Sequence, residues 1–157
     1  MKTLITPHKV AQLVFGDDEY LAAGRVTEAD IAAAEARYIR PVLGAALHER
    51  LLEGAYADFV TNYLAAPIAR YTRLMVQSQL DIRTDRCGTT APKPDGAQPA
   101  SEEARSRQRR ALLTEARTLL RRASRHLADH QEEFPEYDPR CDILNRCSID
   151  GGLVQIR

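Results

Sequence analysis

Two histidines on one predicted helix are the strongest candidates for metal chemistry in this sequence. His126 and His130 stand four residues apart, a spacing that places both imidazoles on the same side of a helix, where they could chelate a metal ion. No Asp, Glu or Cys stands at a spacing known to complete such a ligand set. We therefore interpret the two histidines as structural residues and expect no metal site.

Nucleophilic and cofactor chemistry have even less support. Cys87, Cys141 and Cys147 form an odd set, and the five-residue gap between the last two matches no common zinc or redox pattern, so free thiols are expected. His48 and Glu49 lack the second histidine of a zinc-protease helix. The glycines form neither a P-loop, nor a G-x-S-x-G elbow, nor a dinucleotide fingerprint. We expect no catalytic residues and no cofactor, and we do not expect an enzyme.

Anion binding is the chemistry that the sequence indicates most clearly. The segment RQRRALLTEARTLLRRASRH, residues 107–126, holds seven arginines in twenty residues. At about 100° per residue, its leucines and alanines fall on one side of a helix and most of its arginines on the other. The arginine face, as we call this second side, consists of Arg107, Arg110, Arg117, Arg121, Arg122 and Arg125.

The arginine face has two interpretations. It can be the solvated side of an amphipathic helix, because arginine is a good helix former with a long aliphatic stem. It can also be a contact surface, because a helix that is merely soluble usually mixes both signs of charge, whereas only Glu115 interrupts these arginines. The second interpretation requires an anionic partner.

The same chain supplies one candidate for that partner. Acidic residues follow the arginines directly, and we predict that three of them contact a neighbouring subunit or another partner: Glu132, Glu133 and Glu136. A contact between the arginines of one subunit and the acids of the next is heterologous, and heterologous contacts that close make rings. A DNA-reading helix is the other candidate, but this face has few of the Asn, Gln, Ser and Thr side chains that read bases.

Composition limits the fold to one ordinary domain. The chain has 157 residues, 44% of them apolar, which is enough for a single sizeable core. Lys plus Arg equals Asp plus Glu at 22 each, so the protein as a whole has no basic excess for holding a polyanion. The start of the chain does not resemble a signal peptide, and no stretch approaches the roughly 20 apolar residues that span a bilayer. We expect a cytoplasmic protein without membrane contacts.

Helical spacing of apolar residues runs through most of the chain and predicts an all-α fold. Thr6 and Pro7 predict the start of a helix that ends near Val14. Residues 27–30 resemble a capping box and begin a second helix, with an inner face of Ile31, Ala34, Tyr38 and Ile39, which Pro41 should end or kink. Residues 41–54 predict a further helix that stops at Gly54.

Two long helices should form the centre of the domain. The first carries an apolar stripe over about five turns, formed by Leu64, Ile68, Tyr71, Met75 and Ile82 with Val76 beside it. The second begins after the N-cap Ser101 and buries Leu112, Leu113, Ala116, Leu119, Leu120, Ala123 and Leu127. We predict that the two pack as an antiparallel hairpin in which Leu119 lies in the middle of the buried stripe.

The segments outside these helices should be irregular. Residues 85–100 are rich in Pro and Gly and poor in apolar side chains, so we predict a mobile loop. In residues 146–157, Asp150 precedes two glycines as in a turn, and Leu153, Val154 and Ile156 favour an extended tail. This tail could pack on its own helices or dock on a neighbouring subunit. The whole chain, residues 1–157, is therefore expected to be one helical domain.

The order of these elements resembles that of the helical head-tail connector proteins of tailed phages and prophages. The similarity lies in ARYIRPVLGAALHERLLEG (residues 36–54) and in LAAPIARYTRLMVQSQLDIRT (residues 64–84), which are followed by a loop, a long second helix and an extended tail. It spans residues 1–145 and contains no invariant chemical motif. The loop at residues 87–100 is longer than in the family pattern, and the Gly-Gly tail has no counterpart in it.

The resemblance implies a structural role. Subunits of that family form a ring beneath the portal of the DNA-filled capsid, where they provide a platform for tail completion proteins. It therefore implies a homo-oligomer that contacts portal and tail completion proteins, lies near double-stranded DNA without reading it, and becomes a virion component. The alternative from another functional class is a DNA-binding regulator that uses the arginine face.

Overall fold

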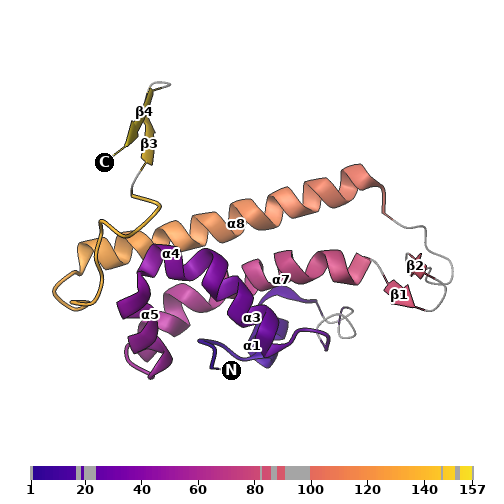
Figure 1. Ribbon diagram of the computed structural model, residues 1–157, viewed down its shortest axis with the longest axis horizontal. Coiled ribbons are helices and arrows are strands. Elements are labelled where there is room, and N and C mark those ends of the chain that lie inside the picture. Colours follow the sequence, from indigo (N-terminus) through magenta and orange to yellow (C-terminus); the bar gives the residue numbers. More distant parts are fainter. Residues whose placement is uncertain are drawn as a thin grey trace.

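The computed structural model describes residues 2–16, 19, 24–81, 83–85, 88–90, 100–145, 147–150 and 153–156, and the side chains of residues 2–16, 19, 24–77 and 100–145. The fold is all-α, as the sequence predicts, with two short hairpins added (Figure 1). In chain order the elements are α1 (Pro7–Val14), α3 (Glu28–Ala34), the π-helical turn η2 (Glu35–Ile39), α4 (Arg40–Leu43), α5 (Ala45–Leu52), α6 (Ala57–Phe59), the π-helical turn η3 (Val60–Leu64), α7 (Ala65–Asp81), β1 (Arg83–Asp85), β2 (Gly88–Thr90), α8 (Glu102–Asp129), β3 (Cys147–Asp150) and β4 (Leu153–Ile156).

The helix starts follow the capping chemistry of the sequence. The Thr6 hydroxyl accepts a hydrogen bond from the Lys9 N–H at the start of α1. Thr27 and Asp30 form the predicted capping box of α3. Ser101 caps α8 by accepting from the Ala104 N–H. Each cap provides a partner for an N–H group that the first helical turn leaves unpaired.

Pro41 does not end its helix, which was one of the two outcomes that the sequence predicts. The helix widens into η2, where the Arg40 N–H donates to the Glu35 carbonyl five residues earlier, and then continues as α4. In a regular helix the proline ring clashes with the carbonyl four residues before it, and a π-helical turn relieves such crowding. The same arrangement recurs before Pro67, where the Ala65 N–H donates to the Val60 carbonyl of η3.

Gly44 divides the predicted helix of residues 41–54 into α4 and α5. Its backbone has φ 81° and ψ 162°, a conformation that essentially only glycine adopts without strain. The expectation of one continuous helix here was wrong, because an apolar pattern does not report the φ angle of a single glycine. The predicted stop at Gly54 is confirmed, since α5 ends at Leu52 with Glu53 as its C-cap and Gly54 follows with φ 99°.

The core lies around α7, against which α1, α3 and α8 pack. Helices α7 and α8 lie side by side and run antiparallel, as predicted (Figure 1). Tyr38 stacks on Tyr71 with ring centroids 4.1 Å apart and so joins η2 to α7. The largest side chains that are fully buried include Ile31, Ile39, Leu43, Leu47, Leu64, Ile68 and Leu127.

Three residues of the predicted stripe on α8, Leu112, Leu113 and Leu119, are only partly buried, and Leu119 is the one that was expected at its centre. Ala116, Leu120, Ala123 and Leu127 are buried, but Leu119 is only partly buried. The buried face of α8 is centred nearer to Leu120, because Ser124 is also buried on the side away from Leu119. Leu119 therefore flanks the core and is not at its centre.

The irregular segments contain short paired strands. Strands β1 and β2 are antiparallel, with Thr84 opposite Thr89, and most of the predicted mobile loop of residues 85–100, namely 86–87 and 91–99, lies outside the described residues, as does Ile82. In the predicted tail of residues 146–157, β3 and β4 pair with Ser148 opposite Gln155. Within the described parts of the chain, no helix combines the length and the apolar character needed to cross a membrane.

Candidate protein interface on helix α8

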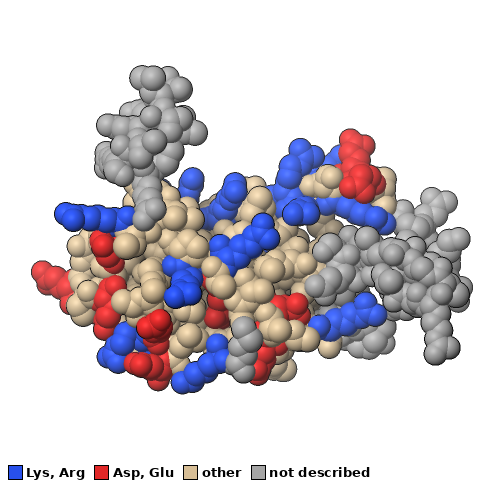
Figure 2. All heavy atoms as spheres, viewed as in Figure 1, with Lys and Arg blue, Asp and Glu red and all other residues tan. Residues whose placement is uncertain are grey.

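The six residues of the arginine face are all exposed along α8. Figure 2 shows Lys and Arg side chains spread along the edge of the molecule that α8 forms. Glu115, the acid that interrupts the arginines in sequence, pairs with Arg70 of α7 at 2.9 Å (Oε2 to Nε). No carboxylate among the described residues forms an ion pair with Arg117, Arg121 or Arg125. This surface therefore has an uncompensated positive charge within the described part of the chain.

A hollow of about 580 Å³ lies beside the C-terminal half of this face. It is lined by Tyr63, Thr118, Arg121, Arg122, Arg125, His126 and Asp129, and we call it the arginine hollow. Tyr63 comes from η3 and the other lining residues from α8. The Arg122 guanidinium lies 4.9 Å from the centroid of the Tyr63 ring, a cation–π contact that holds the arginine in place.

Two of the residues that line this hollow, Tyr63 and His126, belong to an aromatic stack. The His126 ring lies parallel to that of Tyr63, with centroids 4.2 Å apart, and its other ring contacts are with Phe59, His130 and Phe134. The two histidines that could have chelated a metal are thus packed against each other and against aromatic rings. Among the described residues, no group of three His, Cys, Asp or Glu side chains could hold a metal ion.

A second hollow, of about 540 Å³, adjoins the first. It is lined by Tyr56, Ala57, Asp58, Phe59, Asn62, Tyr63, His126, Glu133 and Phe134, and we call it the acidic hollow because its charged lining residues are Asp58 and Glu133. Tyr63 and His126 line both hollows. The aromatic stack is therefore the boundary between a positive and a negative depression of the same surface.

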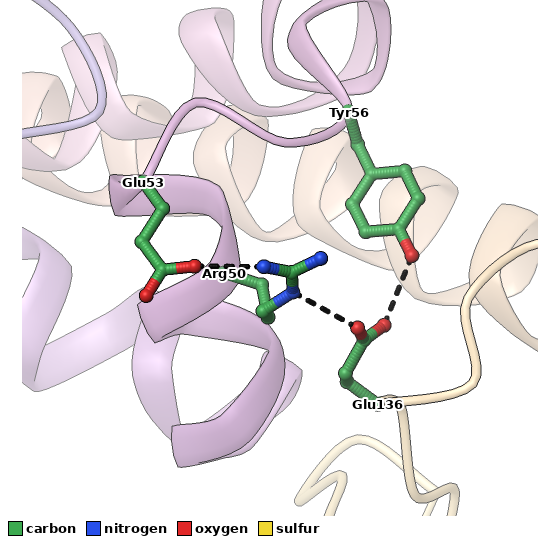
Figure 3. A network of polar contacts seen from close by, with 4 residues as sticks. All are labelled: Arg50, Glu53, Tyr56 and Glu136. Atoms are coloured by element: carbon green, nitrogen blue, oxygen red, sulfur yellow. Dashed lines mark hydrogen bonds and ion pairs between the residues drawn. The ribbon is translucent and has the colours of Figure 1, made fainter.

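The predicted acidic contact residues do not all share one environment. Glu132 and Glu133 are exposed, as a partner contact requires. Glu136 instead accepts hydrogen bonds from Arg50 Nε at 3.1 Å and from the Tyr56 hydroxyl at 3.0 Å, and Arg50 also pairs with Glu53 (Figure 3). A hydrogen bond from its own backbone N–H, followed by those from Tyr56 and Arg50, lowers the pKa of Glu136 against the opposing effect of burial. Glu136 therefore fixes the segment after α8 to α5, and its role as a partner contact stays a prediction.

Comparison with known proteins places these elements in a family. A model of the DUF6712 family, described as a family of unknown function, matches residues 39–145, which is more than half of the chain. The chain belongs to the DUF6712 family. The matched range holds α4 to α8 and every residue of both hollows, whereas α1 and α3 lie before it. No curated protein and no solved structure matches the chain.

The DUF6712 segment also contains a buried polar cluster that the sequence did not reveal. Asp142 is fully buried and accepts hydrogen bonds from Ser124 at 2.5 Å, Tyr137 at 2.8 Å, the Leu144 N–H at 2.7 Å and Asn145 at 3.3 Å. Burial, and then the hydrogen bond to Asp142, raises the pKa of the Tyr137 phenol. The cluster holds residues 137–145 against α8. Its one sequence signal was Ser124, a polar residue among the apolar positions of that helix.

We expect the stability of this DUF6712 protein to fall in mild acid because of His126. Burial, and then the neighbouring His130, lowers the pKa of His126 below the ordinary histidine value of about 6.5. The neutral ring is thus favoured in the folded state, so its contribution to stability is complete above about pH 6.5 and is lost as the pH falls toward the lowered pKa. Urea unfolding at pH 7.5 and pH 5 should show this loss, and His126→Phe should reduce it.

The control for this measurement is His8→Phe, since His8 is exposed. The His8 variant should keep the pH dependence of the wild type. An unchanged pH dependence in the His126 variant would contradict the assignment.

Proposed function

We propose that the protein is a structural assembly protein that uses the arginine face of α8 to bind acidic protein surfaces, including those of further copies of itself. The observation that carries the proposal is the exposed, single-sign face, whose residues Arg117, Arg121 and Arg125 have no carboxylate partner among the described residues. Like charges held along one helix repel one another, and a complementary surface removes that cost.

The chemistry of the rest of the surface supports binding over catalysis. The His and Tyr side chains beside the arginines are stacked on one another, and the buried Asp142 accepts a hydrogen bond from Ser124 that joins α8 to the segment after it. These contacts make α8 a rigid platform, which suits an assembly role because rigid surfaces lose little conformational entropy on association.

The specific form that we propose is a head-tail connector subunit of a tailed phage or prophage. In this role copies would form a ring between the portal and the tail, with portal and tail completion proteins as neighbours and double-stranded DNA close by. The support is the resemblance in helix order, together with the antiparallel hairpin of α7 and α8. The protein would act in the cytoplasm of the producing cell and then in the virion.

The test compares the wild type with the triple variant Arg117→Glu, Arg121→Glu, Arg125→Glu in sedimentation over a wide concentration range. The wild type should associate and the variant should not, because the reversal makes the α8 surface negative. Adding Glu132→Lys and Glu133→Lys should restore part of the association. The matched control replaces the same arginines by lysine, which keeps the charge and should weaken association much less.

Binding to DNA is measured in parallel. A wild type that binds one duplex with nanomolar affinity at physiological salt, and random duplex at least about a thousandfold more weakly, would have the properties of a sequence-specific regulator. That outcome, or a triple variant that associates like the wild type, would refute the assembly function.

A further inference from the structure

The two hollows beside α8 carry opposite charge and share a wall. Three arginines, Arg121, Arg122 and Arg125, and one acid, Asp129, line the first. Asp58 and Glu133 line the second, and the stacked rings of Tyr63 and His126 line both. A surface whose adjoining halves have opposite charge is complementary to itself after a rotation of 180°. Such self-complementarity is the requirement for a two-fold contact between identical subunits.

The order of charges along the end of α8 and the turn that follows it matches that symmetry. Arg125 and Asp129 lie two residues on either side of Leu127, and Arg121 and Glu133 lie six residues on either side. All four are exposed, while Leu127 is fully buried beneath them. Where the C-terminal ends of two α8 helices cross antiparallel at the level of Leu127, Arg125 of each copy would therefore lie opposite Asp129 of the other copy, and Arg121 would face the turn after α8 that holds Glu133.

We propose that the occupant of these hollows is a second copy of this chain, docked about a two-fold axis near the Tyr63–His126 stack. In this pair, Arg125 and Arg121 of each copy lie against Asp129 and Glu133 of the other copy. This inference rests on the proposed function, because it names the first partner of the arginine face. A two-fold contact occupies the same surface on both subunits and therefore joins only two copies, so a ring would need a second, separate interface.

The charges of the patch favour a protein copy over a nucleic acid. Asp58, Asp129 and Glu133 stand beside the arginines and would repel a phosphate backbone at the centre of the patch. A second copy turns the same three acids into attractive contacts. Both signs of charge are then satisfied by one partner.

The experiment uses two charge-reversed proteins and their mixture. One carries Arg121→Glu and Arg125→Glu, and the other carries Asp129→Lys and Glu133→Lys. Each should be monomeric alone, with pairing weakened by about 100-fold or more, since every central contact then joins like charges. Mixed in equal amounts they should form a one-to-one heterodimer, and light scattering should give twice the subunit mass for both the mixture and the wild type.

The matched control is Arg107→Glu with Arg110→Glu, which makes the same change in charge on the same helix but outside both hollows. This variant should pair like the wild type, and circular dichroism should show that all variants remain folded. Loss of pairing in the control would overturn the proposed patch, as would a monomeric wild type.

Two further outcomes separate the pair from the proposed function. Mixtures or wild type that grow beyond two copies through these same residues would show a head-to-tail contact, which overturns the two-fold pair and leaves the assembly function standing. A wild type that forms dimers and also binds one DNA duplex specifically would support the two-fold pair and refute the assembly function.

Discussion

Replacing Leu120 by alanine is expected to lower the free energy of unfolding by about 2–5 kcal/mol. Leu120 is 2% exposed on the face of α8 that packs against α7. Truncation removes apolar contacts and leaves a cavity, because the surrounding helices relax only in part. Urea unfolding monitored by circular dichroism would measure the change, which should appear as a lower midpoint with an unchanged slope.

The adjacent leucine provides the control. Leu119 has the same helix propensity as Leu120 but is only partly buried, so Leu119→Ala should cost about 1 kcal/mol or less. Equal losses at the two positions would mean that α8 is rotated relative to the arrangement described above. The same rotation would displace the arginine face, so this pair of variants also tests the orientation of the proposed interface.

The second large effect is expected at Asp142. Asp142→Ala removes the acceptor that serves Ser124, Tyr137 and the Leu144 N–H in the interior of the protein. A buried donor that loses its partner costs about 1–3 kcal/mol, so the variant should lose on the order of 3 kcal/mol or more of unfolding free energy. Hydrogen exchange should also become faster over residues 137–145, because the cluster attaches this segment to α8.

The comparison for this variant is Asp138→Ala. Asp138 is exposed and lies four residues earlier in the same segment. Its replacement should change stability by about 1 kcal/mol or less. If Asp142→Ala were no more harmful than Asp138→Ala, the buried cluster would not be what holds the segment in place.

Local chemistry explains why parts of the fold could be predicted from the sequence. The caps at Thr6, Thr27 and Ser101 depend on a side chain and a backbone N–H within three residues, so the sequence contains all the necessary information. The long hairpin of α7 and α8 could be predicted as well, because an apolar stripe that runs over several helical turns has to be buried, and a second long helix buries it along its whole length.

Other parts of the fold depend on backbone geometry that composition does not report. Pro41 could have ended its helix, but the π-helical turn η2 before it lets the helix continue into α4. Gly44 was expected inside a helix, but its φ of 81° divides that helix. Leu119 and Leu120 differ by a rotation of about 100° on the helix, and the apolar pattern alone left room for either to be central.

The candidate site shows the same division between local and long-range information. The arginine face was visible because its residues share one helix. The acidic hollow was not visible, because Asp58 and Glu133 are far apart in sequence and meet only through the fold. Nor does the sequence show that Tyr56, 80 residues before Glu136, and Arg50, 86 residues before it, would both donate hydrogen bonds to the Glu136 carboxylate.

In the π-helical turn η3, the number of residues decides which side chains face α8 as much as the residue types do. A π-turn holds about one residue more than an α-turn, so deleting the exposed Thr61 would let η3 close into a regular helix. Everything before the deletion would then rotate by about 100° and shift by about 1.5 Å relative to α7. Phe59 and Tyr63 could no longer both face His126 of α8. A one-residue deletion here would thus turn every helical residue before it to a different side of the helix. Relatives that keep both rings packed on α8 should therefore keep the number of residues between Phe59 and Pro67.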